Sequence, residues 1–550
     1  MKIFAAQLNP TVGDLKGNAL KISEAYARGV KLGADIVIFP EMILTGYLPQ
    51  DLLFSEDFLG ALDAEVDKLV SATTAETALI LSVPRRVDNH QTHATGLVDK
   101  PLTFNSALFC AGGKVLSTHG KEHLFNYSVA DEKRVFAFHT EHTPQEWKGV
   151  SIGIPICRDV WYSDVCEKLK NKGADILLSP NGSPYFSGKH EGRVELMQNR
   201  VKETGCPALY LNLVGGQDDY IFDGRSFACS VDIDTPTAQF SPWVEEEQLL
   251  EFKGNQITGK LSPLPESKWQ DIYHATVMGL RDYCHKNGFT KAVLGLSGGV
   301  DSALVAVLAA EALGKENVTG ILMPSDYSTS HSVDDANALA TNLGIHTHML
   351  PIKQLKGAFD NTWKETFSEA PSGLTEQNLQ ARLRGSLVMA FTNAQASTLA
   401  LTTGNKSEVA VGYCTLYGDM NGAYNPIKDL YKTEVFDLCA WINRDAEIIP
   451  DNILSKPPSA ELAPDQKDSD SLPDYPVLDA ILKLAIERNI WSAETIAKET
   501  GVSLQMAKDV LRLIRINEYK RYQAAPGPKL SKVAFGVDRR YPLTNRFSIQ

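Results

Sequence analysis

The first half of the chain alternates short apolar runs with amphipathic segments. Apolar runs typical of buried strands occupy residues 3–8, 36–39, 78–82, 106–110, 150–156, 176–179 and 208–213. Residues 16–32, between the first two runs, have the spacing of an amphipathic helix. Because alternating buried strands and helices are typical of layered α/β domains, we expect such a domain over residues 1–250.

This pattern weakens near the middle of the chain and then starts again. Glycine and proline cluster at residues 254–265, and both favour turns, so we place a linker over residues 251–267. Ser267 can cap a helix over residues 269–286. The strands expected in the second domain, residues 268–550, are 292–296, 319–323, 345–350 and 398–402.

Net charge, cysteine pattern and the lack of long apolar stretches disfavour several classes of protein. The 54 Lys and Arg residues against 67 Asp and Glu give a net charge of −13, which disfavours binding to nucleic acid or anionic membranes. The eight cysteines contain no C-x-x-C pair, which disfavours a zinc or redox motif and fits a reducing compartment. The N-terminal residues lack a signal-peptide pattern, and no apolar stretch approaches the roughly 18 residues of a membrane helix. We therefore expect a cytoplasmic protein.

A glycine-rich turn, residues 297–302 with the sequence SGGVDS, separates an expected strand from an apolar helix pattern. The first amides of a helix lack internal partners, so a turn at this point can bind an anion. The two glycines allow close approach of the backbone to a phosphate, and the two serines add hydroxyl donors. Asp301 fits this site if it holds a Mg²⁺ that bridges to phosphates. The turn is not a Walker A loop, which has a different pattern.

A second polar cluster follows the expected strand at residues 398–402. Thr403 and nearby backbone amides can contact ATP, and Glu408 can share Mg²⁺ with Asp301. Further candidate contacts are Asn378 and Arg382, four residues apart on an expected helix, and the phosphate partners Lys432 and Ser459. The second half therefore predicts a site for ATP and magnesium.

The first half carries a different kind of chemistry. Glu41, Lys121 and Cys157 lie near the ends of expected strands, where α/β sheets place active sites. A thiolate attacks carbon far better than a thiol, so Glu41 can remove the thiol proton and later activate water. Lys121 can favour the thiolate and stabilise the oxyanion of a tetrahedral intermediate. These three residues predict a cysteine hydrolase.

Together with residues 131–136 and 181–184, this trio resembles the nitrilase, or carbon–nitrogen hydrolase, superfamily over about residues 1–250. The resemblance implies a four-layer αββα sandwich that acts as a glutaminase. It implies that Glu132 orients Lys121. The glutamine-binding residues that it implies are Tyr127, Ser183 and Arg193.

One residue departs from that superfamily pattern. Relatives often carry Glu directly after the nucleophile, where it would meet the α-ammonium group of glutamine, whereas this chain has Arg158. Arginine cannot replace a carboxylate in that contact, so the resemblance supports the nucleophile more strongly than it supports glutamine as the amide donor.

In the second half, the turn at residues 297–302 resembles the pyrophosphate-binding loop of ATP pyrophosphatases, and the order of the blocks over about residues 269–546 resembles NAD⁺ synthetases. This resemblance implies a Rossmann-like, doubly wound parallel sheet with a helical tail. By this likeness, ATP contacts are Gly295, Leu296, Ser297, Gly298, Gly299, Val300, Asp301, Ser302, Thr403, Lys432 and Ser459. Contacts to deamido-NAD⁺ are Asn378, Arg382, Glu408 and Lys520, and Asp301 and Glu408 hold Mg²⁺.

The two halves complement each other chemically. An ATP pyrophosphatase activates a carboxylate as an acyl-adenylate, which needs a nitrogen nucleophile, and a carbon–nitrogen hydrolase can release ammonia. The whole chain therefore resembles the glutamine-dependent NAD⁺ synthetases. That family likeness implies a homo-oligomeric ligase that uses ATP, deamido-NAD⁺ and glutamine, with ammonia passed inside the protein.

Three alternatives stay open from the sequence. The chain can be another AMP-forming amidotransferase, or an amidase whose second half senses nucleotides. Residues 493–514 also have the rhythm of a helix-turn-helix, which raises a DNA-binding regulator. The second helix of that segment is only weakly basic, so packed structural helices are favoured over a DNA module.

Overall fold

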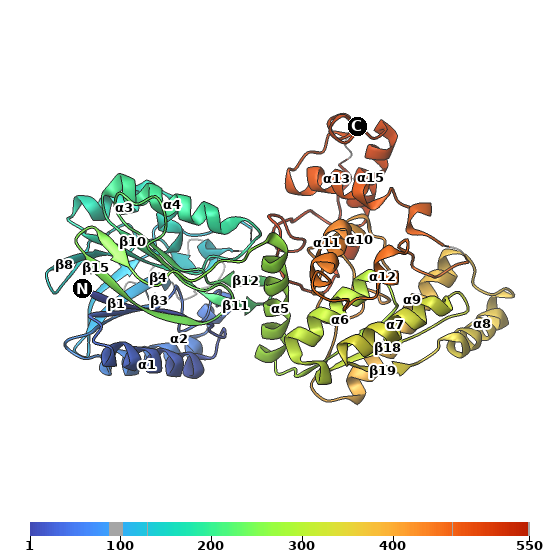
Figure 1. The fold of residues 1–550 in the computed structure, drawn as a ribbon, viewed down its shortest axis with the longest axis horizontal. Helices are drawn as coiled ribbons and strands as arrows, with labels where there is room; N and C mark the ends of the chain where they lie inside the picture. Colours follow the sequence, from blue (N-terminus) through green and yellow to red (C-terminus); the bar gives the residue numbers. More distant parts are fainter. Residues whose placement is uncertain (87–102, 129, 465, 548–550) are drawn as a thin grey trace. The chain divides into compact units, whose positions relative to one another are not determined.

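The computed structural model describes residues 1–86, 103–128, 130–464 and 466–547. The described chain divides into two compact units, Met1–Glu266 and Ser267–Gln550, and each is described by itself below. Figure 1 shows the elements of both units.

The first unit contains two large sheets. One has the order β16 (Gln256–Thr258), β15 (Glu246–Lys253), β1 (Lys2–Gln7), β2 (Ile36–Ile38), β3 (Ala78–Arg86), β4 (Thr103–Ala111) and β5 (Lys114–Gly120), with β6 (Phe136–Ala137) paired to β4. The other has the order β14 (Ala238–Gln239), β13 (Phe227–Cys229), β10 (Ala208–Asn212), β9 (Ile176–Asn181), β8 (Val150–Gly153) and β7 (Gln145–Trp147). A separate hairpin joins β11 (Val214–Gln217) and β12 (Tyr220–Asp223).

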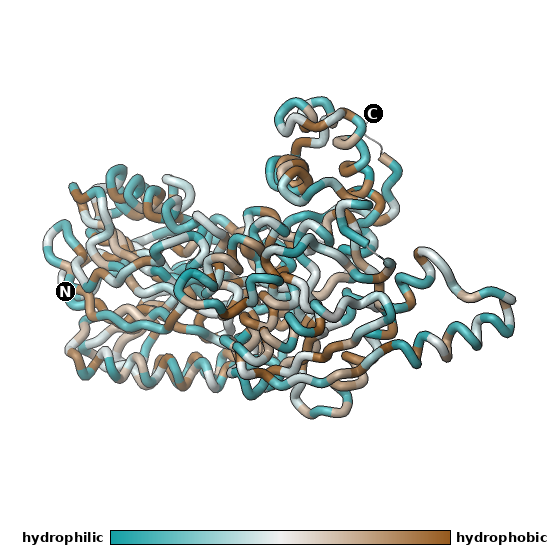
Figure 2. Tube along the Cα trace, turned by 45° about the vertical axis from the view of Figure 1, so that its right-hand side comes forward, coloured by the Kyte–Doolittle hydropathy of each residue, from teal (hydrophilic) through white to brown (hydrophobic). Residues whose placement is uncertain are grey.

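Helices cover the outer faces of these two sheets (Figure 1). They are α1 (Leu15–Lys31) and α2 (Glu56–Ser71) on one side, and α3 (Ser163–Asn171) and α4 (Lys189–Thr204) on the other. Hydropathy alternates along α1 in Figure 2, as expected for a helix with one buried face. A buried cluster that includes Ile38, Ile80, Ile154 and Leu178 draws residues from both sheets, so the sheets pack against each other. This arrangement confirms the expected αββα sandwich.

The segment 251–267, which the sequence predicts as a linker, lies partly within the first unit. β15 pairs antiparallel with β1, and β16 extends it as a hairpin. Phe252 and Ile257 bury their side chains against the core between the sheets. Because glycine and proline also build tight hairpins, their clustering marked the turns around these strands rather than an extended connection.

The second unit is built on a parallel sheet of order β19 (His346–Met349), β18 (Val318–Leu322), β17 (Lys291–Gly295) and β20 (Thr398–Ala400). The chain moves outward from β17 to β19 and then returns to place β20 on the other side of β17. This doubly wound order confirms the Rossmann-like expectation. It creates a switch point between β17 and β20, the position at which such sheets bind ligands.

Helices surround this sheet and extend into a tail. The first is α5 (Lys268–Lys286), where Ser267 accepts a hydrogen bond from the amide of Gln270, as the sequence predicts for a cap. The others are α6 (Val300–Leu313), α7 (Ser330–Leu343), α8 (Lys353–Phe367), α9 (Leu374–Ala394), α10 (Lys406–Val411), α11 (Lys432–Ile442), α12 (Asp451–Ser455), α13 (Tyr475–Leu482), α14 (Ala493–Thr500), α15 (Leu504–Ile516) and α16 (Glu518–Tyr522).

The helix-turn-helix rhythm corresponds to α14 and α15. Ile496, Ala507, Val510 and Ile514 are buried in one cluster with residues of α10 and α13. This packing agrees with the expectation of structural helices.

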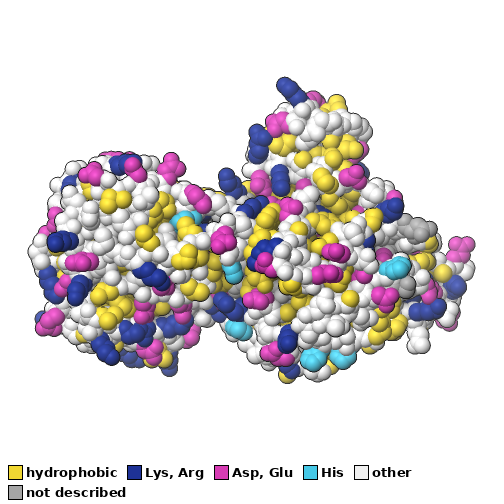
Figure 3. All heavy atoms as spheres, in the orientation of Figure 1, with side chains coloured by type: hydrophobic (Ala, Val, Ile, Leu, Met, Phe, Trp, Pro, Cys, Tyr) yellow, Lys and Arg dark blue, Asp and Glu magenta, His cyan; other side chains and the backbone are white. Residues whose placement is uncertain are grey.

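Three further features concern the helices, the surface charge and the cysteines. Among the described residues, no helix combines the length and apolar character needed to cross a membrane. Figure 3 shows acidic and basic side chains interspersed over the visible face of the first unit. All eight cysteines fall in the described part of the chain, and each carries a free thiol.

Candidate functional site

The three candidate catalytic residues of the first unit are brought together by its sheets. Glu41 follows β2, Lys121 follows β5, and Cys157 lies just beyond β8 at the start of a short 3₁₀ helix, Cys157–Trp161. Glu41 and Lys121 are fully buried, and Cys157 is 6% exposed. The ends of three strands therefore place an acid, an amine and a thiol in one enclosed site.

Lys121 lies between two carboxylates. Its Nζ is 2.8 Å from Glu41 Oε1 and 2.9 Å from Glu132, so the structure places Glu132 where the sequence resemblance expects it. Asn105, which sequence reasoning missed, donates to both acids, at 2.6 Å to Glu41 and 3.2 Å to Glu132. Phe125 donates its amide to the second oxygen of Glu132 at 2.6 Å. These bonds fix the ammonium group and both acids before any substrate arrives.

The backbone around the thiol is equally constrained. Cys157 has a φ of 46°, in the left-handed region that non-glycine residues rarely occupy, which is common at functional turns. The Gly182 amide donates to Glu41 Oε2 at 2.8 Å and also faces the thiol. A Cβ at Gly182 would lie 3.1 Å from that oxygen and from the Tyr47 ring, so the position has little room for a side chain. The turn therefore holds the sulfur close to its base.

Electrostatics keep this thiol protonated in the resting site. Burial raises the pKa of Cys157 above its usual value, and the Glu41 carboxylate raises it further, while Lys121 opposes the shift. Although burial disfavours a charged amine, Glu132 and Glu41 raise the pKa of Lys121 overall, so the ammonium form persists. The sequence suggested that Lys121 favours a thiolate. Lys121 does lower the pKa of Cys157, as expected, but burial and the Glu41 carboxylate outweigh it and raise that pKa overall.

Arg193 is held by other residues of the first unit. Its guanidinium donates to both oxygens of Asp223, at 2.7 and 2.9 Å, and to the Ser183 carbonyl at 2.8 Å. Its Nε donates to Ser183 Oγ at 3.2 Å, and the whole side chain is buried. Because every nitrogen of Arg193 already has a partner, this residue positions the Ser183 loop instead of offering a free group to substrate.

Tyr127 and Arg158 lie together at the surface. Tyr127 is 54% exposed, and its hydroxyl accepts a hydrogen bond from Arg158 at 2.5 Å. The guanidinium carbon of Arg158 is 4.5 Å from the centre of the Tyr127 ring, and Arg158 also donates to Tyr162 at 3.1 Å. The residue that departs from the superfamily pattern is thus held among aromatic rings, directly after the nucleophile.

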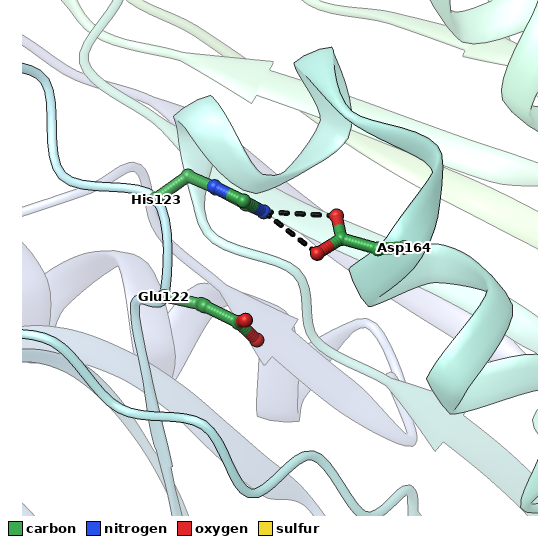
Figure 4. A group of neighbouring side chains, drawn as sticks. All are labelled: Glu122, His123 and Asp164. Carbon is green, nitrogen blue, oxygen red and sulfur yellow. Dashed lines mark hydrogen bonds and ion pairs between the residues drawn. The ribbon is translucent and has the colours of Figure 1, made fainter.

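A neighbouring group, Glu122, His123 and Asp164, offers three ligand atoms within 4.8 Å of one another. Figure 4 shows His123 bonded to Asp164, with a shortest distance of 2.8 Å, while Glu122 lies apart from that pair. Lys168 donates to both oxygens of Glu122, at 2.9 and 2.7 Å, and lies 3.8 Å from Asp164. The ammonium group of Lys168 already supplies the positive charge that a metal ion would bring, so this group is a charge network.

The second unit contains a cavity of about 600 Å³ at the switch point of its sheet. The candidate site residues that line it are Gly295, Leu296, Ser297, Gly299, Val300, Asp301, Ser302, Asn378, Arg382, Thr403, Glu408, Lys432, Ser459 and Lys520. The structure thus gathers residues separated by more than 200 positions around one space. Gly298 is the one candidate ATP-binding residue that is not among the lining residues of this cavity, although it belongs to the loop at residues 297–302.

The loop at residues 297–302 has the geometry of an anion site. Gly298 has a φ of 77°, and a Cβ there would lie 2.2 Å from the Ser332 carbonyl oxygen, so glycine is required. Gly299 precedes α6 without a side-chain cap, which leaves the first amides of that helix available. Ser297 and Ser302 exchange a hydrogen bond of 3.1 Å across the loop.

The two predicted magnesium ligands, Asp301 and Glu408, both contact the ammonium group of Lys432. Lys432 Nζ lies 2.5 Å from Asp301 Oδ2 and 3.2 Å from Glu408 Oε1, so a single positive charge already bridges the two acids. Asn405 donates to the other oxygen of Asp301 at 3.0 Å. Burial raises the pKa of Glu408 to about 8, opposed by Lys432, while Asp301 adds to the rise. Two carboxylate oxygens around one cation position, facing a phosphate loop, fit the donor set that Mg²⁺ prefers.

The remaining candidates of this cavity are held by local bonds. Lys520 donates to the carbonyls of Gly412 and Cys414, both at 2.7 Å, and Arg382 donates to the carbonyl of Leu416 at 3.2 Å. Asn378 accepts from the Thr415 hydroxyl at 2.8 Å. Ser459 donates to the Gln466 carbonyl at 2.5 Å. These contacts are with the protein itself, so ligand contacts by these side chains are part of the proposal below.

Sequence reasoning missed Asp468 and Tyr475. Asp468 lines the cavity, and its carboxylate accepts from the Tyr475 hydroxyl at 2.8 Å. Tyr475 also donates to Glu408 at 3.5 Å. A third buried acid therefore faces the predicted metal ligands. Asp468 falls in a stretch rich in Asp, Ser and Pro, where no local pattern separates one aspartate from the others.

Two family models match the two units. The carbon-nitrogen hydrolase model matches residues 2–250, and the NAD synthase model matches residues 272–524. The chain therefore joins a hydrolase domain of the nitrilase type to an NAD synthase domain.

Relatives of full length share both domains. The glutamine-dependent NAD(+) synthetase of Synechocystis sp. is 42% identical over 563 residues, covering 100% of this chain and 99% of that protein. The synthetase of Rhodobacter capsulatus is 42% identical over 562 residues with the same coverage. A solved structure of the enzyme from Acinetobacter baumannii, in complex with adenosine diphosphate, has 34% identity and a TM-score of 0.77, covering 99% of this chain and 98% of that one. The chain belongs to the glutamine-dependent NAD⁺ synthetase family.

Proposed function

We propose that this chain is a ligase that makes NAD⁺ with glutamine as its nitrogen source. Deamido-NAD⁺, ATP, glutamine and water give NAD⁺, AMP, diphosphate and glutamate. The observation that carries this proposal is the gathering of the phosphate loop, two acids and Lys432 in one cavity, on a chain that also holds the Glu41–Lys121–Cys157 cluster. Similarity to relatives over the full length supports the same pairing of domains.

In the first unit, Glu41 acts as the base for Cys157. The thiol proton passes to Glu41 as the sulfur attacks the amide carbon of glutamine, because the raised pKa of Cys157 disfavours a free thiolate beforehand. Lys121 supplies positive charge to the oxyanion that forms. Glu41 then gives its proton to the departing ammonia and activates the water that hydrolyses the thioester to glutamate. Glu132 and Asn105 hold Lys121 and Glu41 in place for both steps.

In the second unit, the carboxylate of deamido-NAD⁺ attacks the α-phosphorus of ATP. The bond to the β-phosphate oxygen breaks and diphosphate leaves, held by the amides and hydroxyls of the loop at residues 297–302. Asp301 and Glu408 would hold Mg²⁺, which supplies charge neutralisation to the phosphates. Lys432 balances these acids in the absence of ligand, and its ammonium group suits a phosphate oxygen when ATP is bound. Ammonia then attacks the acyl carbon, and AMP leaves.

Direct assay of the products tests this proposal. Pure protein is mixed with ATP, Mg²⁺ and deamido-NAD⁺, and either glutamine or ammonium is added. We expect NAD⁺ and AMP in equal amounts with either nitrogen source. An amidase with a nucleotide-sensing domain would release ammonia without AMP, and formation of ADP would exclude the proposed adenylation.

The family likeness also leads us to propose a cytoplasmic homo-oligomer that passes ammonia between its sites. Light scattering of the purified chain measures the oligomer directly, and a mass equal to one chain would contradict this part of the proposal.

A further inference from the structure

The helical tail contains a second hollow, which we call the tail hollow. It encloses about 510 Å³ between α15 and the C-terminal residues 539–547. Spaces of this size accommodate small organic ligands. None of the described residues that line it belongs to the ATP, deamido-NAD⁺ or Mg²⁺ sets above. The tail hollow is therefore separate from the proposed reaction site.

One wall of the tail hollow is cationic. Lys508, Arg512 and Arg515 recur along α15 at the spacing that places them on one face of a helix, while the opposite face packs into the core. Lys508 and Arg512 are exposed, and neither forms an ion pair with a described residue. Arg515 donates to the Phe547 carbonyl at 3.1 Å and so ties the chain end to the helix. Both cationic groups line the hollow, and the exposed Glu494 of α14 interacts electrostatically with Lys508.

The facing wall is aromatic. Trp491 and Tyr541 lie with ring centres 5.7 Å apart, and Phe547 is 74% exposed. The guanidinium carbon of Arg539 lies 3.9 Å from the centre of the Tyr541 ring. The half-buried Trp491 ring and the exposed Tyr541 ring, both beside a guanidinium group, suit the stacking of a planar aromatic ring.

The acids beside the tail hollow are already engaged. Glu518 is 2.9 Å from Arg521 and 2.5 Å from Arg539, so its charge is balanced locally. Asp509 accepts a hydrogen bond from Gln505 at 3.0 Å. Four cationic residues line the hollow against two acids, Asp509 and Glu518, so it keeps a net positive character in a chain whose overall charge is −13. Figure 3 shows basic and hydrophobic side chains side by side on the visible face of the tail.

We propose that the tail hollow is a second ligand site that binds a nucleoside phosphate. The base stacks on Trp491 and Tyr541, and the phosphate lies against Lys508 and Arg512, which match phosphate oxygens in charge and hydrogen-bonding capacity.

Nucleic acid is disfavoured as the occupant because C-terminal residues lie beside the basic face of α15. A recognition helix must present its face openly to a groove, whereas Tyr541, Pro542 and Asn545 wall the space beside this helix. A concave site of this volume fits a small molecule better than a duplex.

Fluorescence titration of the full-length chain tests this assignment. The signal is the part of the tryptophan emission that disappears in Trp491→Phe, since the chain has seven tryptophans. The probes are AMP, adenosine, inorganic phosphate and a short DNA duplex. The variants are Lys508→Ala combined with Arg512→Ala, and the control Lys498→Ala, an exposed lysine of α14 that does not line the hollow.

We expect AMP to change the Trp491 signal saturably and more tightly than adenosine or phosphate alone. The double variant should weaken AMP binding at least tenfold while keeping normal NAD⁺ synthesis, and Lys498→Ala should bind like the unaltered chain. Absence of a saturable signal, or AMP binding unchanged in the double variant, would overturn the assignment. Tighter binding of the duplex than of AMP would overturn it in favour of a nucleic-acid site. The readout does not depend on turnover, so it stands apart from a failure of the proposed reaction.

Discussion

The hydrolase site and the nucleotide site of this chain differ in how their charged side chains are held. In the first, Glu41, Lys121 and Glu132 are fully buried, and Lys121 bonds to each of the two acids at 2.8–2.9 Å. Asn105 and backbone amides hold the acids further. In the second, the charged groups surround an open cavity of about 600 Å³, and Lys432 occupies the position between the two acids that a metal ion suits.

The difference follows from where each site obtains its charge. Attack by a thiol creates a transient oxyanion, so its partners must be fixed in advance within a small, water-poor space. ATP brings its own charges and metal, so the protein needs room for them and a counter-ion for its acids when no ligand is bound. One site is thus complete without its substrate, while the other is completed by its ligands.

Substitution of the nucleophile should give the largest difference between glutamine-driven and ammonium-driven synthesis. Cys157→Ala should lower glutamine-driven NAD⁺ synthesis by about 10⁴-fold or more, because no other group can form the thioester. Ammonium-driven synthesis should stay within about twofold of the unaltered chain, since the nucleotide cavity keeps all its residues. Parallel rates with glutamine and with ammonium measure both. Surviving glutamine-driven turnover would show that another residue is the nucleophile.

A substitution in the nucleotide cavity should have the opposite effect, with loss of NAD⁺ synthesis and retention of glutamine hydrolysis. Asp301→Asn should lower synthesis with either nitrogen source by about 10²–10³-fold, because the carboxylate for the phosphate-bound cation is lost. Hydrolysis of glutamine by the same variant should persist. The control Asp334→Asn changes an exposed aspartate of α7 and should have little effect. Equal loss in both variants would point to general damage to the second unit.

The protonation state of the nucleophile gives a pH test. Because burial and Glu41 raise the pKa of Cys157 above its usual value, the thiol is neutral below that pKa and its thiolate fraction rises with pH. Alkylation of Cys157 by iodoacetamide, followed by mass spectrometry, should therefore accelerate about tenfold per pH unit between about pH 7 and 9, without a plateau. A rate that is already constant at pH 7 would mean that Lys121 holds a thiolate at rest.

The smallest of these effects concerns the residue that supports Lys121. Glu132→Gln leaves Lys121 with Glu41 alone, which strengthens that pair and makes Glu41 a weaker base. We expect glutamine hydrolysis to fall about tenfold, equivalent to about 1.4 kcal/mol in the barrier. The control Glu122→Gln alters a neighbouring acid that binds Lys168, and its rate should change little. Equal losses in both variants would remove the case for a specific role of Glu132.

The sequence predicted many of the residues of the two sites. Strand ends and the SGGVDS turn predicted the hydrolase trio and the phosphate loop, because local order fixes which side chains follow a strand. The family resemblance added Glu132 and the block containing Lys520. The structure brings these residues together in their two sites, and Gly298 is the one loop residue that packs against the Ser332 carbonyl and does not line the cavity.

What the sequence did not predict depends on distant partners. Arg193 was expected to contact substrate, but Asp223, thirty residues later, engages its guanidinium. Asn105 of β4 bonds to Glu41, 64 positions away, and to Glu132, 27 positions away. The capture of Lys432 by Asp301 likewise spans 131 positions. Such pairings arise from tertiary packing, which leaves no periodic signal in the chain.

The most direct measurement follows the nitrogen atom from one site to the other. Glutamine labelled with ¹⁵N in its side-chain amide is supplied with ATP, Mg²⁺ and deamido-NAD⁺, and the products are analysed by mass spectrometry. We predict NAD⁺ that carries the heavy nitrogen, with glutamate and AMP formed alongside it. Glutamate released without labelled NAD⁺, or labelled NAD⁺ accompanied by ADP in place of AMP, would contradict the account.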